Sequence, residues 1–171
     1  WTRTKSVGDS PPRRSGRGAR DLASGALLIA EIIDKLADKD PHVRYQALKC
    51  LVGDEVAPHS AEVRAAVIRI CRKDRLGYNR REAMNALVGD WPEPEVVEAF
   101  RERLSDEGYI VEACIQLLGD LGDDQAQGLL IDTFLSSDQV HIRLQVIQAY
   151  MEAGQDAVFR FLKATVAHES S

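Results

Sequence analysis

One stretch of this sequence occurs in four similar copies, and this repetition constrains the fold more than any other feature. The best-formed copy runs from Ile110 to Asp123, reads IVEACIQLLGDLGD, and is broken by Gly119 and Gly122. The other copies begin at Val43, Asn79 and Ile142, so successive starts are 36, 31 and 32 residues apart. A period of this length, built from paired helices, is typical of an α-solenoid.

Small and large apolar residues recur at fixed offsets within the copies. Four residues after each start the side chain is small, which lets two helices approach closely: Ala47, Ala83, Cys114 and Val146. The offsets of five and eight carry larger side chains, namely Leu48, Met84, Ile115 and Ile147, and Leu51, Leu87, Leu118 and Tyr150. These spacings place one apolar face on each helix and predict a continuous core between neighbouring pairs.

Apolar residues at helical spacing predict further helices between the copies, and no segment alternates as a strand would. The first is capped by Asp21 and continues through Leu36, and Asp40-Pro41 begins the second. The expected helices are 21–36, 41–53, 58–73, 79–88, 95–104, 124–135, 140–153 and 156–167, and a further helical stretch begins at Ile110 and is broken at Gly119 and Gly122. The sequence therefore predicts an all-α chain with an arm at 1–20, a repeat domain at 21–167 and a tail at 168–171.

The copies from Val43 to Asp54 and from Ile110 to Asp123 resemble the HEAT-like repeat of the phycobilisome lyase type. The resemblance covers about residues 21–167 and implies four helix pairs and a final capping helix in a short right-handed superhelix. It also implies that the second helices line the concave side, and that an arginine after each start joins a ladder of turns with an acidic side chain. Arg44, Arg80 and Arg143 match this pattern, whereas Val111 departs from it.

Charge is unevenly distributed along the chain. Residues 1–21 carry a net charge of +4 and the whole chain −5, which leaves −9 on residues 22–171. An acidic body disfavours nucleic acid as its ligand, because a phosphate backbone requires a positive surface. Residues 1–20 contain too few aliphatic side chains to offset the entropy of ordering, so we expect a flexible basic arm. Its arginines suit an acidic protein, an anionic membrane surface or, as a further alternative, nucleic acid: Arg13, Arg14, Arg17 and Arg20.

The expected location is the cytoplasm. Trp1 followed by basic residues also fits a juxtamembrane segment, so the chain is alternatively the cytosolic part of a membrane-anchored protein. The three cysteines, Cys50, Cys71 and Cys114, lie in apolar helical patterns without a CxxC motif, which indicates buried free thiols.

No motif for catalysis, cofactor binding or metal binding stands out. His42 and His141 are three repeats apart and cannot share one ion, and nucleophile and phosphate-loop motifs are missing from the sequence. A lone His-Glu pair at His168 disfavours a deoxyhypusine hydroxylase, and the acidic body disfavours an alkylpurine DNA glycosylase. We therefore expect a non-enzymatic protein with no catalytic, cofactor or metal residues.

The exposed offsets of the four copies are the candidate partner-binding residues. A residue with a ring precedes each start: His42, Tyr78, Tyr109 and His141. Two residues after each start the side chains are Tyr45, Arg81, Glu112 and Leu144. Six residues after each start the side chains are long and polar: Lys49, Asn85, Gln116 and Gln148. Tyrosine combines packing area with a hydrogen-bonding tip, as interface anchors do.

The pattern favours a non-catalytic interaction module, a scaffold or adaptor, that binds another protein. The alternatives are that the rings only cover the turns, or that the chain is an accessory subunit or chaperone of a bilin lyase-like, cofactor-attaching enzyme.

Overall fold

The described part of the chain is almost entirely helical and contains no strand. In the computed structural model the described residues are 28–52, 60–88, 94–106 and 108–169. Residues 28–36 are helical, and eight further helices follow: α2 (Pro41–Leu51), α3 (Ala61–Lys73), α4 (Gly77–Leu87), α5 (Pro94–Arg103), α6 (Tyr109–Leu121), α7 (Asp124–Ser136), α8 (Val140–Ala153) and α9 (Gln155–Glu169).

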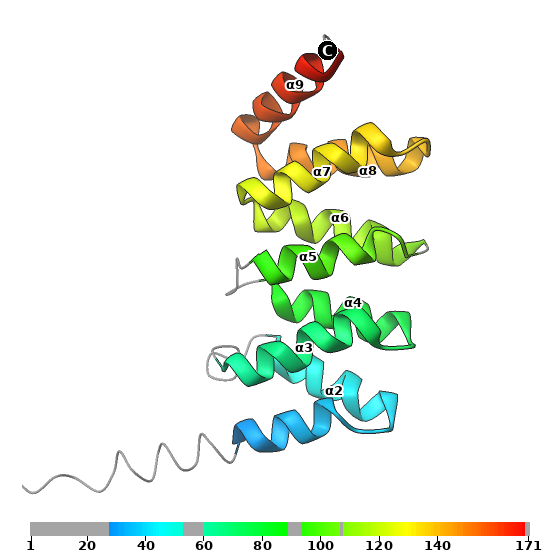
Figure 1. Ribbon diagram of the computed structural model, residues 1–171, viewed down its shortest axis with the longest axis vertical. Helices are drawn as coiled ribbons and strands as arrows, with labels where there is room; N and C mark the ends of the chain where they lie inside the picture. Colours follow the sequence, from blue (N-terminus) through cyan, green and yellow to red (C-terminus); the bar gives the residue numbers. More distant parts are fainter. Residues whose placement is uncertain (1–27, 53–59, 89–93, 107, 170–171) are drawn as a thin grey trace, which may run out of the picture.

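The helices form two layers that build up in one direction. The helices α2, α4, α6 and α8 pack side by side in one layer, and α3, α5, α7 and α9 pack side by side in the other. Figure 1 shows the resulting stack, with helical residues 28–36 at one end and α9 at the other. Each of the four copies therefore supplies one helix of the even-numbered layer, and copies that follow one another in the sequence are neighbours in this layer.

Helix boundaries follow local chemistry. The Asp40 carboxylate accepts a hydrogen bond from the His42 amide, and Pro41 occupies the first turn of α2, where no backbone donor is needed. The helix α6 ends at Gly122, whose φ of 63° lies in the left-handed region that glycine adopts without a Cβ penalty. Asp123 then caps α7 by accepting from the Ala126 amide at 2.7 Å.

The core is built from the predicted apolar offsets. The small column and the eight-residue column are buried throughout, and the five-residue column is buried except at the half-buried Ile147. Tyr150 is 2% exposed, and its hydroxyl donates to the Gln127 carbonyl oxygen at 2.7 Å. Its ring packs on Phe161 of α9, with centroids 4.7 Å apart. The buried side chains thus join the two layers along the stack.

Gly119 does not end α6, contrary to its expected role as a break. It lies inside the helix, where an added Cβ would stand 3.0 Å from the Cβ of Ala149 in α8. The glycine therefore serves the close approach of two helices of the same layer.

The cysteines differ from the expectation at one position. Cys71 and Cys114 are buried, but Cys50 is exposed. It lies in the last turn of α2, to one side of the buried face that Ala47, Leu48 and Leu51 form. An apolar neighbourhood in the sequence was not enough to bury this thiol.

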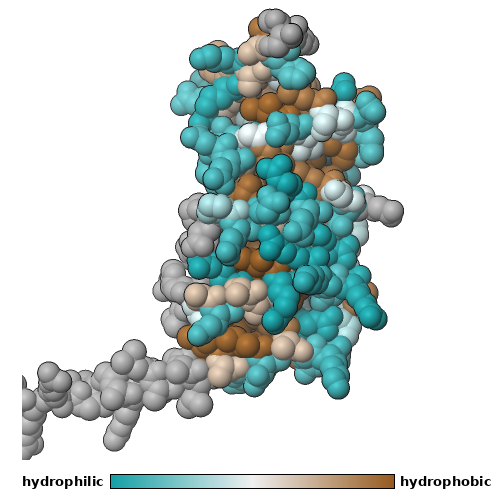
Figure 2. Space-filling view, in the orientation of Figure 1, coloured by the Kyte–Doolittle hydropathy of each residue, from teal (hydrophilic) through white to brown (hydrophobic). Residues whose placement is uncertain are grey.

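The last helix leaves much of its apolar face uncovered. Phe161 is buried, but Phe159, Leu162 and Val166 are 69%, 50% and 62% exposed. A capping helix was expected at this end. The outer face of α9 is nevertheless apolar, and it is exposed because no later helix covers it within the described residues. Figure 2 shows hydrophobic surface in the upper part of the stack and again over its lower end.

None of the described helices combines the length and the apolar character that crossing a membrane requires.

Candidate protein-interaction surface

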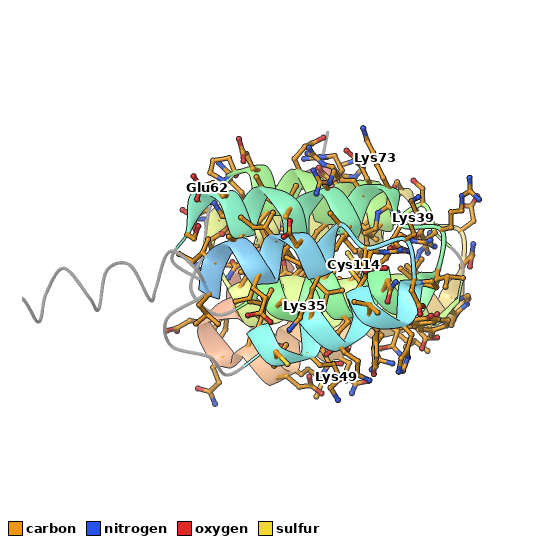
Figure 3. The ribbon with its side chains drawn as sticks, turned by 90° about the horizontal axis from the view of Figure 1, so that it is seen from below. Lys35, Lys39, Lys49, Glu62, Lys73 and Cys114 are labelled. Atoms are coloured by element: carbon orange, nitrogen blue, oxygen red, sulfur yellow. The ribbon has the colours of Figure 1, made fainter. Side chains whose placement is uncertain are left out.

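The outer sides of α2, α4, α6 and α8 form one face, which we call the even-helix face. All twelve predicted partner-binding residues lie on these four helices. Their offsets of −1, +2 and +6 from the start fall within about 60° of arc at 3.6 residues per turn. Ten of the twelve are exposed, and Tyr45 and Asn85 are half-buried. Figure 3 shows Lys49 of α2 and Glu62 of α3 on opposite sides of the stack.

Three rings on α2 and α4 form what we call the aromatic cluster: His42, Tyr45 and Tyr78. The ring centroids of Tyr45 and Tyr78 are 5.5 Å apart at 87°, an edge-to-face contact that joins two neighbouring helices. His42 stacks on Tyr45 with centroids 6.5 Å apart, and the Lys49 ammonium lies 6.0 Å from the Tyr45 ring. Because Tyr78 remains 41% exposed, the cluster presents aromatic surface to solvent.

The other two predicted rings lie outside the aromatic cluster. Tyr109 is 50% exposed at the start of α6, with its hydroxyl oxygen 2.7 Å from where a Cβ on Gly77 would stand. Tyr109 therefore sits over the first residue of α4 and extends the aromatic surface to a third helix. His141 instead lines a cavity beside Val111 and Gln139. The four rings expected as one ladder are thus divided between two places.

The α6 and α8 half of the even-helix face is mostly polar. Gln116 and Gln148 line a small cavity of about 60 Å³, and the Gln148 amide donates to the Glu152 carboxylate at 2.9 Å. Glu112 and Leu144 are exposed, the latter by 59%. The face therefore changes from aromatic and basic on α2 and α4 to amide and acidic on α6 and α8.

An ion pair ties α2 to the turn between α3 and α4. The Arg44 Nε donates to the Asp74 carboxylate at 2.7 Å, and its terminal nitrogen donates to the carbonyl oxygens of Asp38 and Lys39. Asn79 adds hydrogen bonds to Asp74 and to the Pro41 carbonyl oxygen. This arrangement, which we call a rung, connects successive helix pairs.

The environment of Asp74 favours its ionised form. Burial raises the pKa of this carboxyl, with its side chain only 2% exposed. The hydrogen bonds from Arg44, the Leu76 amide and Asn79 outweigh that effect, and the pKa lies below the ordinary aspartate value. The carboxylate is therefore a charged junction between two helix pairs.

Arg80 repeats the rung one pair later. Its Nε donates to the Asp106 carboxylate at 2.8 Å, and its terminal nitrogen donates to the carbonyl oxygens of Asp74 and Arg75. Arg143 donates to the Ser137 carbonyl oxygen at 2.6 Å but pairs with no carboxylate among the described residues. The arginine contacts expected from the resemblance are present, with an acidic partner at two of the three positions.

Sequence reasoning did not assign the acidic partners. Asp74 and Asp106 lie in the turns that precede α4 and α6. A signal was available, because aspartate recurs at positions 38, 74, 106 and 138, at intervals of 36, 32 and 32 residues that match the repeat.

The buried thiols are unsuited to nucleophilic chemistry. Burial raises the pKa of Cys71 to about 12 and that of Cys114 well above its ordinary value. Cys114 also donates to the Phe100 carbonyl oxygen at 3.2 Å. Among the described residues no group of three or more histidine, cysteine or acidic side chains is placed to hold a metal ion.

The predicted arm arginines, Arg13, Arg14, Arg17 and Arg20, lie outside the described residues.

In comparisons with known proteins, no family model matches the chain and no curated protein matches it.

Proposed function

We propose that this chain is a short α-solenoid of HEAT-like helix pairs and acts as a non-catalytic interaction module for another protein. In this proposal the partner binds along the even-helix face, which would be the concave side of the superhelix. The two-layer packing of the helices supports the solenoid assignment, because each copy contacts the next in a single direction.

The observation that carries the proposal is the aromatic cluster. Buried aromatic pairs serve the core, but Tyr45 and Tyr78 meet on the outer side of two helices, and Tyr78 stays 41% exposed. Exposed tyrosines that are held in position by their neighbours lose little rotamer entropy when a partner covers them. The neighbouring Lys49 and Arg81 add positive charge, so the partner segment that meets this part of the face is acidic.

In the experiment, the parent chain and a Tyr45→Ala plus Tyr78→Ala variant are each used as bait to capture proteins from cell extract. Each captured protein is then purified, and its affinity for the parent and for the variant is measured by titration. A matched variant, Glu95→Ala plus Gln125→Ala, removes two exposed side chains from α5 and α7 on the other layer. We expect the tyrosine variant to weaken binding about tenfold or more, and the control to bind as the parent does. Circular dichroism establishes that both variants are folded.

Equal binding by the parent and the tyrosine variant would reject this surface. Binding that weakened only in the control would move the interface to the odd-numbered layer.

A further inference from the structure

An apolar groove lies between α8 and α9, and we call it the end groove. It measures about 670 Å³, and its lining includes Ile147 and Met151 of α8 and Val158, Phe159 and Leu162 of α9. The side chains of Met151, Phe159 and Leu162 are at least half exposed. Single exposed apolar side chains are ordinary, but a contiguous group of them around a groove is typical of an interaction site.

The corresponding side of each earlier copy is buried where another even-numbered helix follows. Leu48, Met84 and Ile115 occupy the offset of five in α2, α4 and α6, and all three are 0% exposed. Each of these helices packs against the next helix of the same layer. Ile147 occupies this offset in α8, which no even-numbered helix follows within the described residues, and it is only half-buried. The end groove therefore exposes a side that is buried in the three earlier copies.

The contact of Gly119 shows where a following helix lies on this side. Gly119 has an offset of nine in α6, and a Cβ added to it would stand 3.0 Å from the Cβ of Ala149 in α8. The residue at the same offset in α8 is Met151, which lines the end groove. A helix that packed on α8 as α8 packs on α6 would therefore cover Met151.

The odd-numbered layer gives the same indication. The helices α3, α5 and α7 each pack against the even-numbered helix that follows, and none of their large apolar side chains is exposed. No helix follows α9 within the described residues, and α9 exposes Phe159 and Leu162. Both walls of the end groove thus consist of surface that a helix covers elsewhere in the stack.

We propose that the end groove binds an amphipathic helix of a partner protein, which takes the position of the next even-numbered helix and extends the stack. The bound helix presents the kind of face that α8 uses within the stack, where a smaller side chain lies between larger ones: Ile142, Val146, Ala149 and Tyr150. The end groove lies at the α9 end of the stack, away from the aromatic cluster on α2 (Figure 1). This inference therefore goes beyond the proposed function.

A second copy of the chain is a less suitable occupant. Its even-numbered helices are held in its own stack by their buried faces, so α9 is the helix available to enter the groove. In an antiparallel pair of α9 helices centred on Leu162, the Lys163 ammonium groups of the two copies would lie near each other and repel. A helix of a different protein has no such constraint.

The test uses a soluble peptide that copies the buried face of α8. The peptide has the length of α8, 14 residues, and keeps the four residues of that face, with glutamate, lysine and alanine elsewhere. Fluorescence anisotropy of a label on the peptide measures its affinity for the full chain. We expect saturable binding with a Kd on the order of 100 µM, and about tenfold weaker binding of a peptide with the same composition in scrambled order.

Two variants of the chain locate the bound peptide. Met151→Ser alters the α8 wall, and Phe159→Ser plus Leu162→Ser alters the α9 wall. Each should weaken peptide binding about tenfold, because the removed side chains are exposed in the free chain and covered in the complex. Circular dichroism establishes that the variants are folded, and either wall decides the matter if the other variant does not fold.

The Tyr45→Ala plus Tyr78→Ala variant is the matched control, since it removes aromatic side chains from α2 and α4 and should bind the peptide as the parent does. Equal binding of the ordered and scrambled peptides, or binding that neither wall variant weakens, would overturn the proposal. Light scattering of the chain alone should show a monomer. A dimer that the Phe159→Ser plus Leu162→Ser variant cannot form would assign the end groove to a second copy instead.

Discussion

At the scale of single residues, Asp74 connects two successive helix pairs. It accepts from Arg44, from Asn79 and from the Leu76 amide, so one side chain joins α2, α4 and the turn after α3. Exposed ion pairs contribute little to stability, but a carboxylate that is 2% exposed and accepts three hydrogen bonds is costly to lose.

Asp74→Asn should lower the free energy of unfolding by about 2–3 kcal/mol, because Arg44 loses its charged partner while remaining largely buried. Asp138→Asn is the matched control, since this carboxylate has the same position in the repeat but is exposed; a change within about 0.5 kcal/mol is expected. Urea denaturation at pH 7 measures both. Equal effects of the two substitutions would contradict the assigned role.

The contribution of Asp74 should also depend on pH. Its pKa is lower in the folded chain than in the unfolded chain, so the unfolded state binds more protons in acid and stability rises with pH. The difference in unfolding free energy between the parent and Asp74→Asn should be full above about pH 4 and should shrink as the pH falls through the folded pKa. A difference that stayed constant down to pH 2 would be inconsistent with this.

The three thiols should differ in reactivity. Cys50 is exposed, whereas Cys71 and Cys114 are buried with raised pKa values. We expect a disulfide reagent to modify one thiol quickly in the folded chain and all three in denaturant, and Cys50→Ser should remove the fast phase. Rapid modification of Cys50→Ser would show that a buried thiol is accessible.

At the scale of helices, packing within the even-numbered layer depends on short distances that small residues allow. Gly119 of α6 faces Ala149 of α8, with an added Cβ only 3.0 Å from the alanine Cβ. Gly128 of α7 is also inside a helix, but an added Cβ there meets nothing within 4 Å. The two positions share the same backbone conformation and differ in their neighbours.

Gly128→Ala should raise the free energy of unfolding by up to about 1 kcal/mol, the gain in helix propensity. Gly119→Ala gains the same propensity but overpacks the α6–α8 contact, which costs about 1–3 kcal/mol. Gly119→Ala should therefore have a free energy of unfolding about 1–3 kcal/mol lower than that of Gly128→Ala. Thermal and urea unfolding of both variants measure the difference, and equal stabilities would contradict the close approach.

At the scale of the whole molecule, the stack has an apolar end. Phe159, Leu162 and Val166 of α9 are exposed together, while Phe161 of the same helix is buried against Tyr150 and Phe134. The same helix therefore carries both core and surface apolar residues.

Phe159→Ser plus Leu162→Ser should reduce binding of a hydrophobic dye and improve solubility, with little change in melting temperature, because both side chains are at least half exposed. Phe161→Ser is the matched control and should cost about 3–5 kcal/mol of unfolding free energy through the lost core ring. A large drop in melting temperature for the surface pair would show that these side chains are packed.

Several features could be predicted from the sequence because they depend on helical periodicity alone. The offsets of four and eight place Ala83, Cys114 and Leu118 inward, and all are buried. Helix α8 begins and ends where expected, and the others differ from their expected bounds by a few residues wherever both ends are described. The polar offsets face outward for the same geometric reason, which explains the exposure of Glu112 and Gln116.

What required the tertiary structure are the contacts between copies. The recurring aspartates mark candidate acidic partners, but only the packing shows that Arg44 pairs with Asp74 and that Tyr45 meets Tyr78. Gly119 looked like a helix end because the contact that explains the glycine is with Ala149, 30 residues away, and the local sequence does not show it. The sequence by itself determined which residues face inward, since periodicity is local. The stacking of the pairs decided which residues meet, since those contacts are made across separate helices.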